Sequence, residues 1–117
     1  MDPVKRIVLR LKLRKTEGTI VHHNALLSRS IKDSKLVAGY ALCMNQACWH
    51  CWVEGPDGTK YDVTREIVPF EYSTEVPEGY QQMSHELIDK NIELFKLYTD
   101  DRKQFWKDAP KSVRDFK

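Results

Sequence analysis

Residues 49–63 (WHCWVEGPDGTKYDV) constrain the fold more tightly than any other stretch of this 117-residue chain. Aromatic and apolar residues lead into Gly55-Pro56-Asp57-Gly58, a strong turn signal because proline presets φ and glycine accepts positive φ. The chain then returns with alternating polarity, which is typical of a half-buried strand. The segment therefore predicts a β-hairpin with strands over residues 47–54 and 59–64.

A third strand and two helices are predicted on either side of this hairpin. Residues 36–43 (LVAGYALC) form a compact apolar run that suits a buried strand, so the three strands together predict an antiparallel β-meander. A short helix is expected over residues 22–31, where Leu27 and Ile31 share one face. An amphipathic helix is expected over residues 83–98, near the C-terminus. The predicted fold class is α+β, with the meander packed against both helices.

The N-terminal segment alternates between apolar and basic residues. Four apolar residues face one way and the basic residues between them face the other: Ile7, Leu9, Leu11 and Leu13 against Arg10, Lys12 and Arg14. This period of two predicts a half-buried strand with a basic outer face. Beyond residue 98 the chain is charged, but it carries Phe105 and Trp106, which can dock on the body. We therefore expect one α+β domain over residues 1–98 and a partly docked charged tail over residues 99–117.

The composition favours a soluble globular protein. Hydrophobic residues make up 41% and charged residues 31% of the chain, and 117 residues fit one domain. The apolar runs are far too short to span a bilayer, and the basic N-terminus lacks the apolar core of a signal peptide. Three cysteines cannot all be paired within the chain and suit a reducing compartment. We therefore expect a cytoplasmic, intracellular protein with no membrane contact.

His50 and Asp62 form the candidate catalytic pair. The hairpin brings their strands side by side, and side chains on one face of paired strands lie a few Å apart. A carboxylate that accepts a hydrogen bond from one imidazole nitrogen fixes the tautomer and leaves the other nitrogen free as a base. The alternative interpretation is a half-buried strand histidine beside a polar residue near the turn, with no catalytic role.

The pattern around these residues resembles a known family. His-x-Trp-x-Glu, a short turn and Asp-Gly-x-x-Tyr-Asp-Val are similar to the histidine–aspartate half of transglutaminase-like and other papain-like cysteine hydrolase folds. Upstream, Val21-His22-His23-Asn24-Ala25 is similar to a helix opening of small bacterial members, which has the form Cys-His-x-Asn-Ala. The resemblance covers about residues 18–68 and implies a reduced papain-like fold. It also implies that His50 is the general base and that Asp62 orients it.

The nucleophile that this family requires is missing from the pattern. The resemblance places a cysteine where this chain has Val21, and valine cannot form an acyl or thioester intermediate. Three alternatives stay open: a different register, a thiol from a neighbouring strand, and a thiol from a partner chain. The candidate thiols of this chain are Cys43, Cys48 and Cys51. A strand cysteine, however, lacks the helix N-terminus that lowers the pKa of such thiols.

The cysteines and histidines also raise the question of redox or metal chemistry. Cys48 and Cys51 form a C-x-x-C, but within a strand their side chains point to opposite faces, so two small apolar residues in a sheet are the simpler interpretation. A structural zinc site usually has two well-spaced ligand pairs. This chain offers one such pair, because the adjacent His22 and His23 do not easily reach one ion. No cofactor or metal is expected, and a zinc-stabilised binding domain is kept as a second alternative.

A protein is the expected partner of this chain. The net charge of +2 is too small to indicate nucleic acid by itself, and the basic segment has no aromatic residue for base stacking. The basic N-terminal strand and the aromatic tail are the expected contact surfaces, although basic side chains on an edge strand also discourage edge pairing. The leading hypothesis is a degenerate papain-like or transglutaminase-like domain, a pseudoenzyme that acts as an interaction or structural module in a larger assembly. The alternative is an active cysteine hydrolase or acyl transferase that acts on amide bonds.

Overall fold

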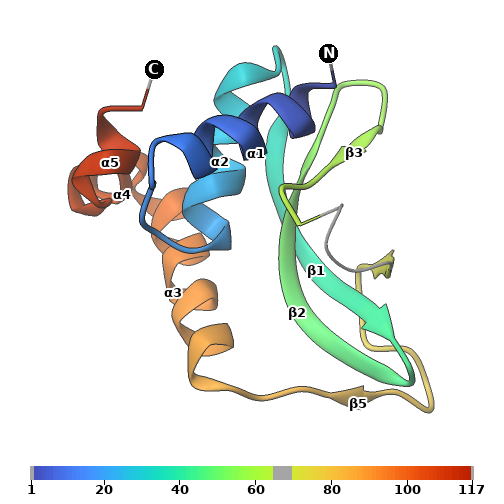
Figure 1. The fold of residues 1–117 in the computed structure, drawn as a ribbon. Helices are drawn as coiled ribbons and strands as arrows, with labels where there is room; N and C mark the ends of the chain where they lie inside the picture. Colours follow the sequence, from blue (N-terminus) through green and yellow to red (C-terminus); the bar gives the residue numbers. More distant parts are fainter. Residues whose placement is uncertain (1, 65–69, 117) are drawn as a thin grey trace.

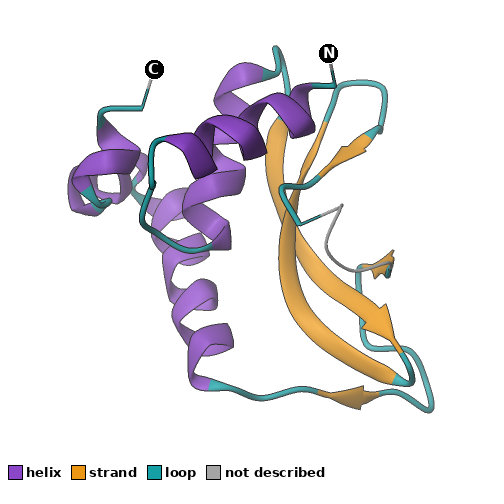
Figure 2. Cartoon of the chain, in the orientation of Figure 1, coloured by secondary structure: helices purple, strands orange, loops and turns teal. Residues whose placement is uncertain are grey.

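The computed structural model describes residues 2–64 and 70–116. Its helices are α1 (Pro3–Leu13), α2 (Ile20–Ser30), α3 (Glu86–Asp100), α4 (Arg102–Asp108) and α5 (Lys111–Arg114). Its strands are β1 (Lys35–Cys43), β2 (Gln46–Glu54), β3 (Lys60–Tyr61), β4 (Glu71–Ser73) and β5 (Gln81–Gln82). The helices gather on one side of the long β1–β2 hairpin, and the short strands extend the sheet around it (Figure 1 and Figure 2).

The sheet confirms the predicted α+β class. The strands lie in the order β3-β2-β1-β4, and neighbours along this path are antiparallel. β5 adds a short parallel pairing at the start of β2. The third strand of the meander is shorter than the predicted span of residues 59–64. It ends at Tyr61, because the backbone beyond it bonds to side chains instead: the N–H of Val63 donates to Asn24 Oδ1 at 2.9 Å.

β1 and β2 form a regular hairpin of two nine-residue strands that pair along their whole length. Met44 and Asn45 make the turn with φ values of 51° and 63°. Two successive positive φ values in a two-residue loop indicate a type I′ turn, whose twist matches the twist of the strands. The predictions for these two strands are confirmed to within one residue at each end. The two predicted helices are confirmed as α2 and α3, with ends shifted by one to three residues.

The predicted N-terminal strand is wrong, because this segment forms helix α1. Asp2 caps the first turn: its Oδ1 accepts a hydrogen bond from the backbone N–H of Val4 at 2.8 Å. Pro3 opens the helix, where its fixed φ is favourable and its missing N–H is not needed. The basic side chains of this segment therefore lie on a helix surface and form no sheet edge.

Burial along α1 follows a helical period and not an alternating one. Val4, Ile7 and Leu11 are buried, which is the spacing of one helix face. Leu9 and Leu13, which an alternating strand would bury together with Ile7 and Leu11, are 50% and 73% exposed. Ile7 and Leu11 are four residues apart, a spacing that suits both periods, so the apolar pattern alone does not distinguish the two structures.

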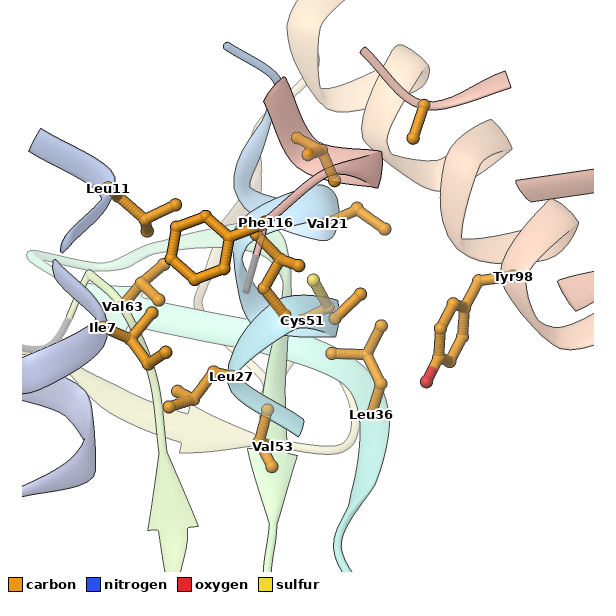
Figure 3. Packing of buried hydrophobic residues seen from close by; sticks show 14 of the residues in the cluster. Ile7, Leu11, Val21, Leu27, Leu36, Cys51, Val53, Val63, Tyr98 and Phe116 are labelled. Atoms are coloured by element: carbon orange, nitrogen blue, oxygen red, sulfur yellow. The ribbon is translucent and has the colours of Figure 1, made fainter. Parts of the chain in front are cut away.

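One apolar cluster fills the space between the helices and the sheet (Figure 3). Val21 of α2 and Cys51 of β2 have no exposed surface and lie within it. Val53 belongs to the same face of β2 as Cys51, because side chains alternate along a strand. The same alternation directs His50 to the opposite face.

The chain beyond α3 completes this cluster. Four of its residues are buried: Phe105, Ala109, Val113 and Phe116. The guanidinium groups of Arg10 and Arg14 lie 4.6 Å and 5.2 Å from the centre of the Phe116 ring, within cation–π distance. The basic N-terminal segment therefore contacts the C-terminal tail, although the sequence predicted that both would contact a partner. Phe105 is buried within its own chain.

Candidate functional site

Asp62 is the centre of a buried hydrogen-bond network. Its Oδ2 accepts from His50 Nε2 at 2.5 Å and from the Tyr72 hydroxyl at 3.0 Å. Its Oδ1 accepts from Asn24 Nδ2 and from the backbone N–H of Thr64, both at 3.1 Å. The proximity of His50 and Asp62 predicted from the hairpin is confirmed. One carboxylate thus joins α2, β2, β4 and the segment after β3.

The early end of β3 places the Asp62 side chain at the edge of β2. The last pair of the β2–β3 ladder joins Val53 and Tyr61. After it, the backbone N–H of Thr64 bonds to the side chain of Asp62 two residues earlier, a local turn that aspartate commonly makes. The carboxylate therefore lies where side chains from both layers of the molecule can reach it.

Asn24 ties the same carboxylate to α2. It has no exposed surface, and its Nδ2 also donates to the carbonyl of Cys51 at 3.0 Å. Its Oδ1 accepts from the N–H of Val63, so both ends of the amide are used. Asparagine is a weak helix former, and these three hydrogen bonds explain why it stands inside α2.

The network holds Asp62 in its charged form. The side chain has no exposed surface, and burial by itself raises the pKa of a carboxyl group. The hydrogen bond and charge of His50, with the bonds from Asn24 and Thr64, outweigh burial and lower the pKa of Asp62 below its usual value. Asp62 is therefore a carboxylate at neutral pH and a strong acceptor for its four donors.

The imidazole of His50 is enclosed on the face of β2 that points away from α2. His50 is 8% exposed. The centre of its ring lies 5.3 Å from the Phe70 ring, 6.3 Å from Trp52 and 6.4 Å from Tyr72. Thr64 Oγ1 lies 3.3 Å from Nε2. Because Nε2 is engaged, Nδ1 is the nitrogen that is left for proton transfer.

Gly39 allows this close packing. It pairs with His50 in the β1–β2 register. A β-carbon at this position would meet the backbone oxygen of Ser73 on β4 and the ring of Trp52. The close approach of β4 and Trp52 to this part of the sheet therefore needs a residue with no side chain.

The three cysteines are free and lie in three different environments. Cys43 is exposed at the end of β1. Cys48 shares a face of β2 with His50, but burial raises the pKa of its thiol, which donates to a neighbouring backbone carbonyl at 3.6 Å. Cys51 faces the apolar cluster, where burial and a nearby carboxylate strongly raise the pKa of its thiol. Among the described residues, none of these thiols is hydrogen-bonded to His50.

Val21, at the position where the resemblance expects a nucleophile, belongs to the apolar cluster. It lies in the first turn of α2 and has no exposed surface. It precedes Asn24 by three residues, so the two share a face of the helix. The helix that contacts Asp62 therefore carries a valine one turn before that contact, and valine offers no group that an imidazole can activate.

The two histidines at the start of α2, His22 and His23, form hydrogen bonds with the backbone of the segment that precedes the helix. His22 Nδ1 accepts from the backbone N–H of Thr19 at 3.0 Å, and its ring stacks on Phe105 with ring centres 5.4 Å apart. Burial, with smaller contributions from His23 and Lys90, lowers the pKa of His22 to about 4. Within residues 2–64 and 70–116, no group of three or more His, Cys, Asp or Glu side chains is placed to hold a metal ion.

The chain matches no protein-family model, no curated protein and no solved structure. In the part of the chain that the structure describes, no helix has both the length and the apolar character needed to cross a bilayer.

The sequence does not single out three members of the Asp62 network: Asn24, Thr64 and Tyr72. Asn24 carries a usable signal, since a polar amide between the apolar residues of a helix needs a partner. Thr64 carries a weaker one, because a residue two positions after an aspartate often bonds to it. Tyr72 carries none, because its place depends on the pairing of β4 with β1.

Proposed function

We propose that this chain is a degenerate papain-like or transglutaminase-like domain that acts as an interaction or structural module and not as a catalyst. The observation that carries the proposal is the closed network around His50 and Asp62. It holds a carboxylate and an oriented imidazole, yet Val21 occupies the nucleophile position of the resembling family. A general base with no nucleophile to activate cannot begin acyl transfer.

The network has a structural use that explains its presence without catalysis. Asp62 accepts four hydrogen bonds, and three of the donors are side chains from α2, β2 and β4. A buried polar network in which every member is satisfied favours one arrangement of the elements it joins. The pair then fixes the sheet edge against α2, and binding is left to the surface of the domain.

A thiol-dependent enzyme is the second candidate, because Cys48 shares a face of β2 with His50. Two residues along a strand separate the two side chains by roughly 6–7 Å, which is outside hydrogen-bond range. Burial also raises the pKa of Cys48, which works against thiolate formation at neutral pH. Activity would therefore require a movement of β2 that brings the Cys48 thiol to Nδ1 of His50.

A cytoplasmic, reducing location is part of the proposal. The three thiols are free: Cys51 is buried, Cys48 is half-buried and Cys43 is exposed. A location of this kind keeps the exposed thiol of Cys43 from forming disulfides between chains.

Thiol reactivity tests the proposal directly. The folded chain is treated at neutral pH with a substoichiometric alkylating agent, and the modified cysteine is mapped by mass spectrometry. We expect Cys43 to react at the slow rate of an ordinary exposed thiol and Cys48 and Cys51 to react more slowly still. The rate of the exposed Cys43 should not change in His50→Ala, nor in the control His85→Ala, whose histidine is exposed at the start of α3. A fast thiol that becomes slow only in His50→Ala would establish an enzyme instead.

The family resemblance has its own test in Val21→Cys. If position 21 corresponds to the nucleophile, the new thiol must reach the imidazole of His50, which lies on the opposite face of β2, and its pKa should then fall below the usual value of about 8.5. If the position is only part of the apolar cluster, burial should raise the pKa of the new thiol. The ultraviolet absorbance of the thiolate, followed against pH, separates the two results, and a raised pKa would contradict the resemblance at this position.

A further inference from the structure

The two ends of the chain are basic and the part between them is acidic. Residues 1–15 hold six basic residues and one acidic residue, and residues 102–117 hold six basic and two acidic residues. The stretch between them holds seven basic and fourteen acidic residues. The fold brings the two basic ends together, because Arg10 and Arg14 lie over the ring of Phe116. The small net charge is therefore the sum of a strongly basic region and an acidic remainder.

Two open hollows lie on this basic region, between the end of α2 and the helices around it. The larger one has a volume of about 550 Å³ and is lined by Arg29, Trp106, Lys107 and Arg114. The smaller one has a volume of about 170 Å³ and is lined by Arg10, Leu26, Arg29, Ser30 and Phe116. The two hollows adjoin, because both are lined by Arg29. Their described lining residues include no aspartate or glutamate.

The cations of this region have no acidic partner. Within residues 2–64 and 70–116, no ion pair is formed by any of Arg10, Arg14, Arg29, Lys107 and Arg114. All of them are exposed except Arg10, which is half-buried. Positive charges gathered in this way repel one another, and a bound polyanion relieves the repulsion.

The acidic residues of the C-terminal helices do not neutralise this charge. Asp108 accepts a hydrogen bond from Gln104 Nε2 at 2.7 Å, and Asp115 pairs with Lys111 at 3.4 Å. Neither aspartate lines a hollow. The positive field of the hollows is therefore open to an anion from outside the chain.

Aromatic rings hold three of the arginines in place. The guanidinium of Arg29 lies 4.7 Å from the centre of the Trp106 ring, and Phe116 holds Arg10 and Arg14 in the same way. A guanidinium that is held by its face keeps its N–H edge free to donate to phosphate oxygens, often to two at once. The basic N-terminal segment has no aromatic residue of its own, which argued against nucleic acid. The fold supplies the rings from the other end of the chain.

We propose that this surface binds single-stranded nucleic acid. Phosphates occupy the two adjoining hollows, where the arginines and Lys107 donate to their oxygens. A base packs against Trp106, which is half-buried and lines the larger hollow. The inference names a partner for the proposed interaction module, and it rests on that function only in that the domain acts by binding.

Other anionic partners match the surface less completely. An acidic protein segment supplies carboxylates but no flat base for Trp106. A membrane surface is bound by apolar side chains that project into the lipid, whereas Phe116 is 7% exposed and Trp106 is half-buried. A duplex offers phosphates, but its bases are stacked inside it and only unpaired bases can pack against a protein ring.

Fluorescence anisotropy of the full chain tests the proposal. The labelled ligand is a single strand of about 16 thymidine nucleotides, and a duplex of the same length is the second ligand. For a single strand, the logarithm of the association constant falls with the logarithm of the salt concentration by about 0.7 for each phosphate contact. We expect a slope of about −3, which corresponds to four contacts.

A charge variant and a matched control place the binding on this surface. Arg29→Gln with Arg114→Gln removes two exposed cations. This variant should weaken binding of the single strand at least about tenfold at roughly 0.1 M salt and make the slope shallower by about 1.4. Lys90→Gln with Lys96→Gln removes the same charge from exposed positions of α3 and should leave the slope unchanged.

Trp106→Leu tests the base contact. It should weaken binding of the single strand about tenfold and leave binding of the duplex unchanged, because only an unpaired base can stack on the ring. The salt slope should stay the same, since no charge is removed. Where the loss of the ring also lowers stability, the arginine variant still decides the proposal, because both of its positions are exposed.

The outcomes separate this inference from the proposed function. Absence of oligonucleotide binding, or a slope that changes equally in the arginine and lysine variants, would overturn the nucleic-acid proposal and leave the non-catalytic function standing. Displacement of the oligonucleotide by polyglutamate at equal charge would overturn it in favour of an acidic protein, and tighter binding to phosphatidylserine vesicles would do so in favour of a membrane. Equal losses for single strand and duplex in Trp106→Leu would overturn the single-strand preference. A thiol activated by His50 would overturn the proposed function alone.

Discussion

Asp62 collects hydrogen bonds from parts of the chain that are distant in sequence. An isolated buried carboxylate is strongly unfavourable, and it is tolerated here because each oxygen accepts two donors. The arrangement has a consequence for function. A carboxylate that accepts hydrogen bonds from His50, Asn24 and Tyr72 contributes to the fold itself, so its presence does not by itself indicate catalysis.

Asp62→Ala should therefore lower stability strongly. The substitution removes the carboxylate that accepts four hydrogen bonds in a buried site, and the loss of a buried hydrogen-bond partner costs about 1–3 kcal/mol. Urea unfolding followed by circular dichroism measures the change in free energy. Glu93→Ala, at an exposed position of α3, is the control and should change stability by less than about 0.5 kcal/mol. A loss of similar size in both variants would contradict the role assigned to the network.

His22 gives the stability of the fold a pH dependence with a defined sign. Its folded pKa is lowered to about 4 from the usual value of 6.5, so between these values the unfolded chain binds more protons than the folded chain. The stabilising contribution of neutral His22 is therefore present above pH 6.5 and is lost as pH falls toward 4. One histidine of this kind produces a slope of at most about 1.4 kcal/mol per pH unit.

His22→Gln should reduce this slope. Glutamine cannot titrate, and it can still accept from the Thr19 N–H, as glutamine does at this helix position in a capping box. Urea unfolding at pH values from 4 to 7 measures the slope in each protein. Burial also lowers the pKa of His23, so part of the slope should persist in the variant. An identical slope in the two proteins would show that His22 is not the buried, uncharged group described.

At the scale of elements, the hairpin and α1 show how local preferences decide a structure. The β1–β2 turn places Met44 and Asn45 at positive φ. Asparagine accepts this region readily, whereas methionine does not. Lys15 also has positive φ, 50°, at the end of α1. There the backbone N–H of Thr16 bonds to the carbonyl of Leu11 at 3.0 Å, so the hydrogen bonding of the helix end holds the strained residue in place.

Met44→Asn should raise stability by about 0.5–1 kcal/mol. The side chain of Met44 is 90% exposed, so its replacement loses no packing, while asparagine fits the left-handed region of a type I′ turn better. Thermal unfolding measures the gain as a higher Tm. Met83→Asn, outside this turn, should give no such gain. A decrease in Tm for Met44→Asn would contradict the turn geometry.

At the scale of the whole molecule, the two ends of the chain are joined through Phe116. Arg10 of α1 and Arg14, the residue that follows α1, lie over its ring, and Val113 one turn earlier has no exposed surface. The last helix therefore contributes to the same apolar cluster as α1 and α2 (Figure 3). The chain depends on its buried C-terminal residues for stability, which limits their use as a contact surface for a partner.

Phe116→Ala should lower the free energy of unfolding by about 2–4 kcal/mol. This is somewhat less than for a phenylalanine in the middle of a core, because residues near a chain end are less firmly held. Lys111→Ala is the control, since its ion pair with Asp115 at 3.4 Å is exposed and contributes little. Urea unfolding should show one cooperative transition for both variants, at a lower midpoint for Phe116→Ala alone. An unchanged midpoint would mean that α5 does not pack as described.

Much of the fold could be predicted from the sequence where local signals agree. The apolar run of β1, the alternation of β2 and the spacing of α3 each specify one structure, and the hairpin was enough to bring His50 to Asp62. The N-terminal segment was predicted wrongly because Ile7 and Leu11 satisfy both periods, and the cap formed by Asp2 and Pro3 is what distinguishes them. Tyr72 could not be predicted as a partner of Asp62, because no local pattern encodes the pairing of β4 with β1.

The sequence by itself determined the helices and strands that have a clear period, the pairing of His50 with Asp62, and the valine at position 21. These depend on residues that are near in sequence, where backbone geometry fixes which side chains share a face. Only the tertiary structure decided that Asn24 and Tyr72 complete the network, that Phe116 lies under Arg10, and that Arg29 lies over Trp106. Such contacts depend on how separate elements pack against each other. The packing is determined by burial of apolar surface from the whole chain, so it cannot be predicted from any short stretch of sequence.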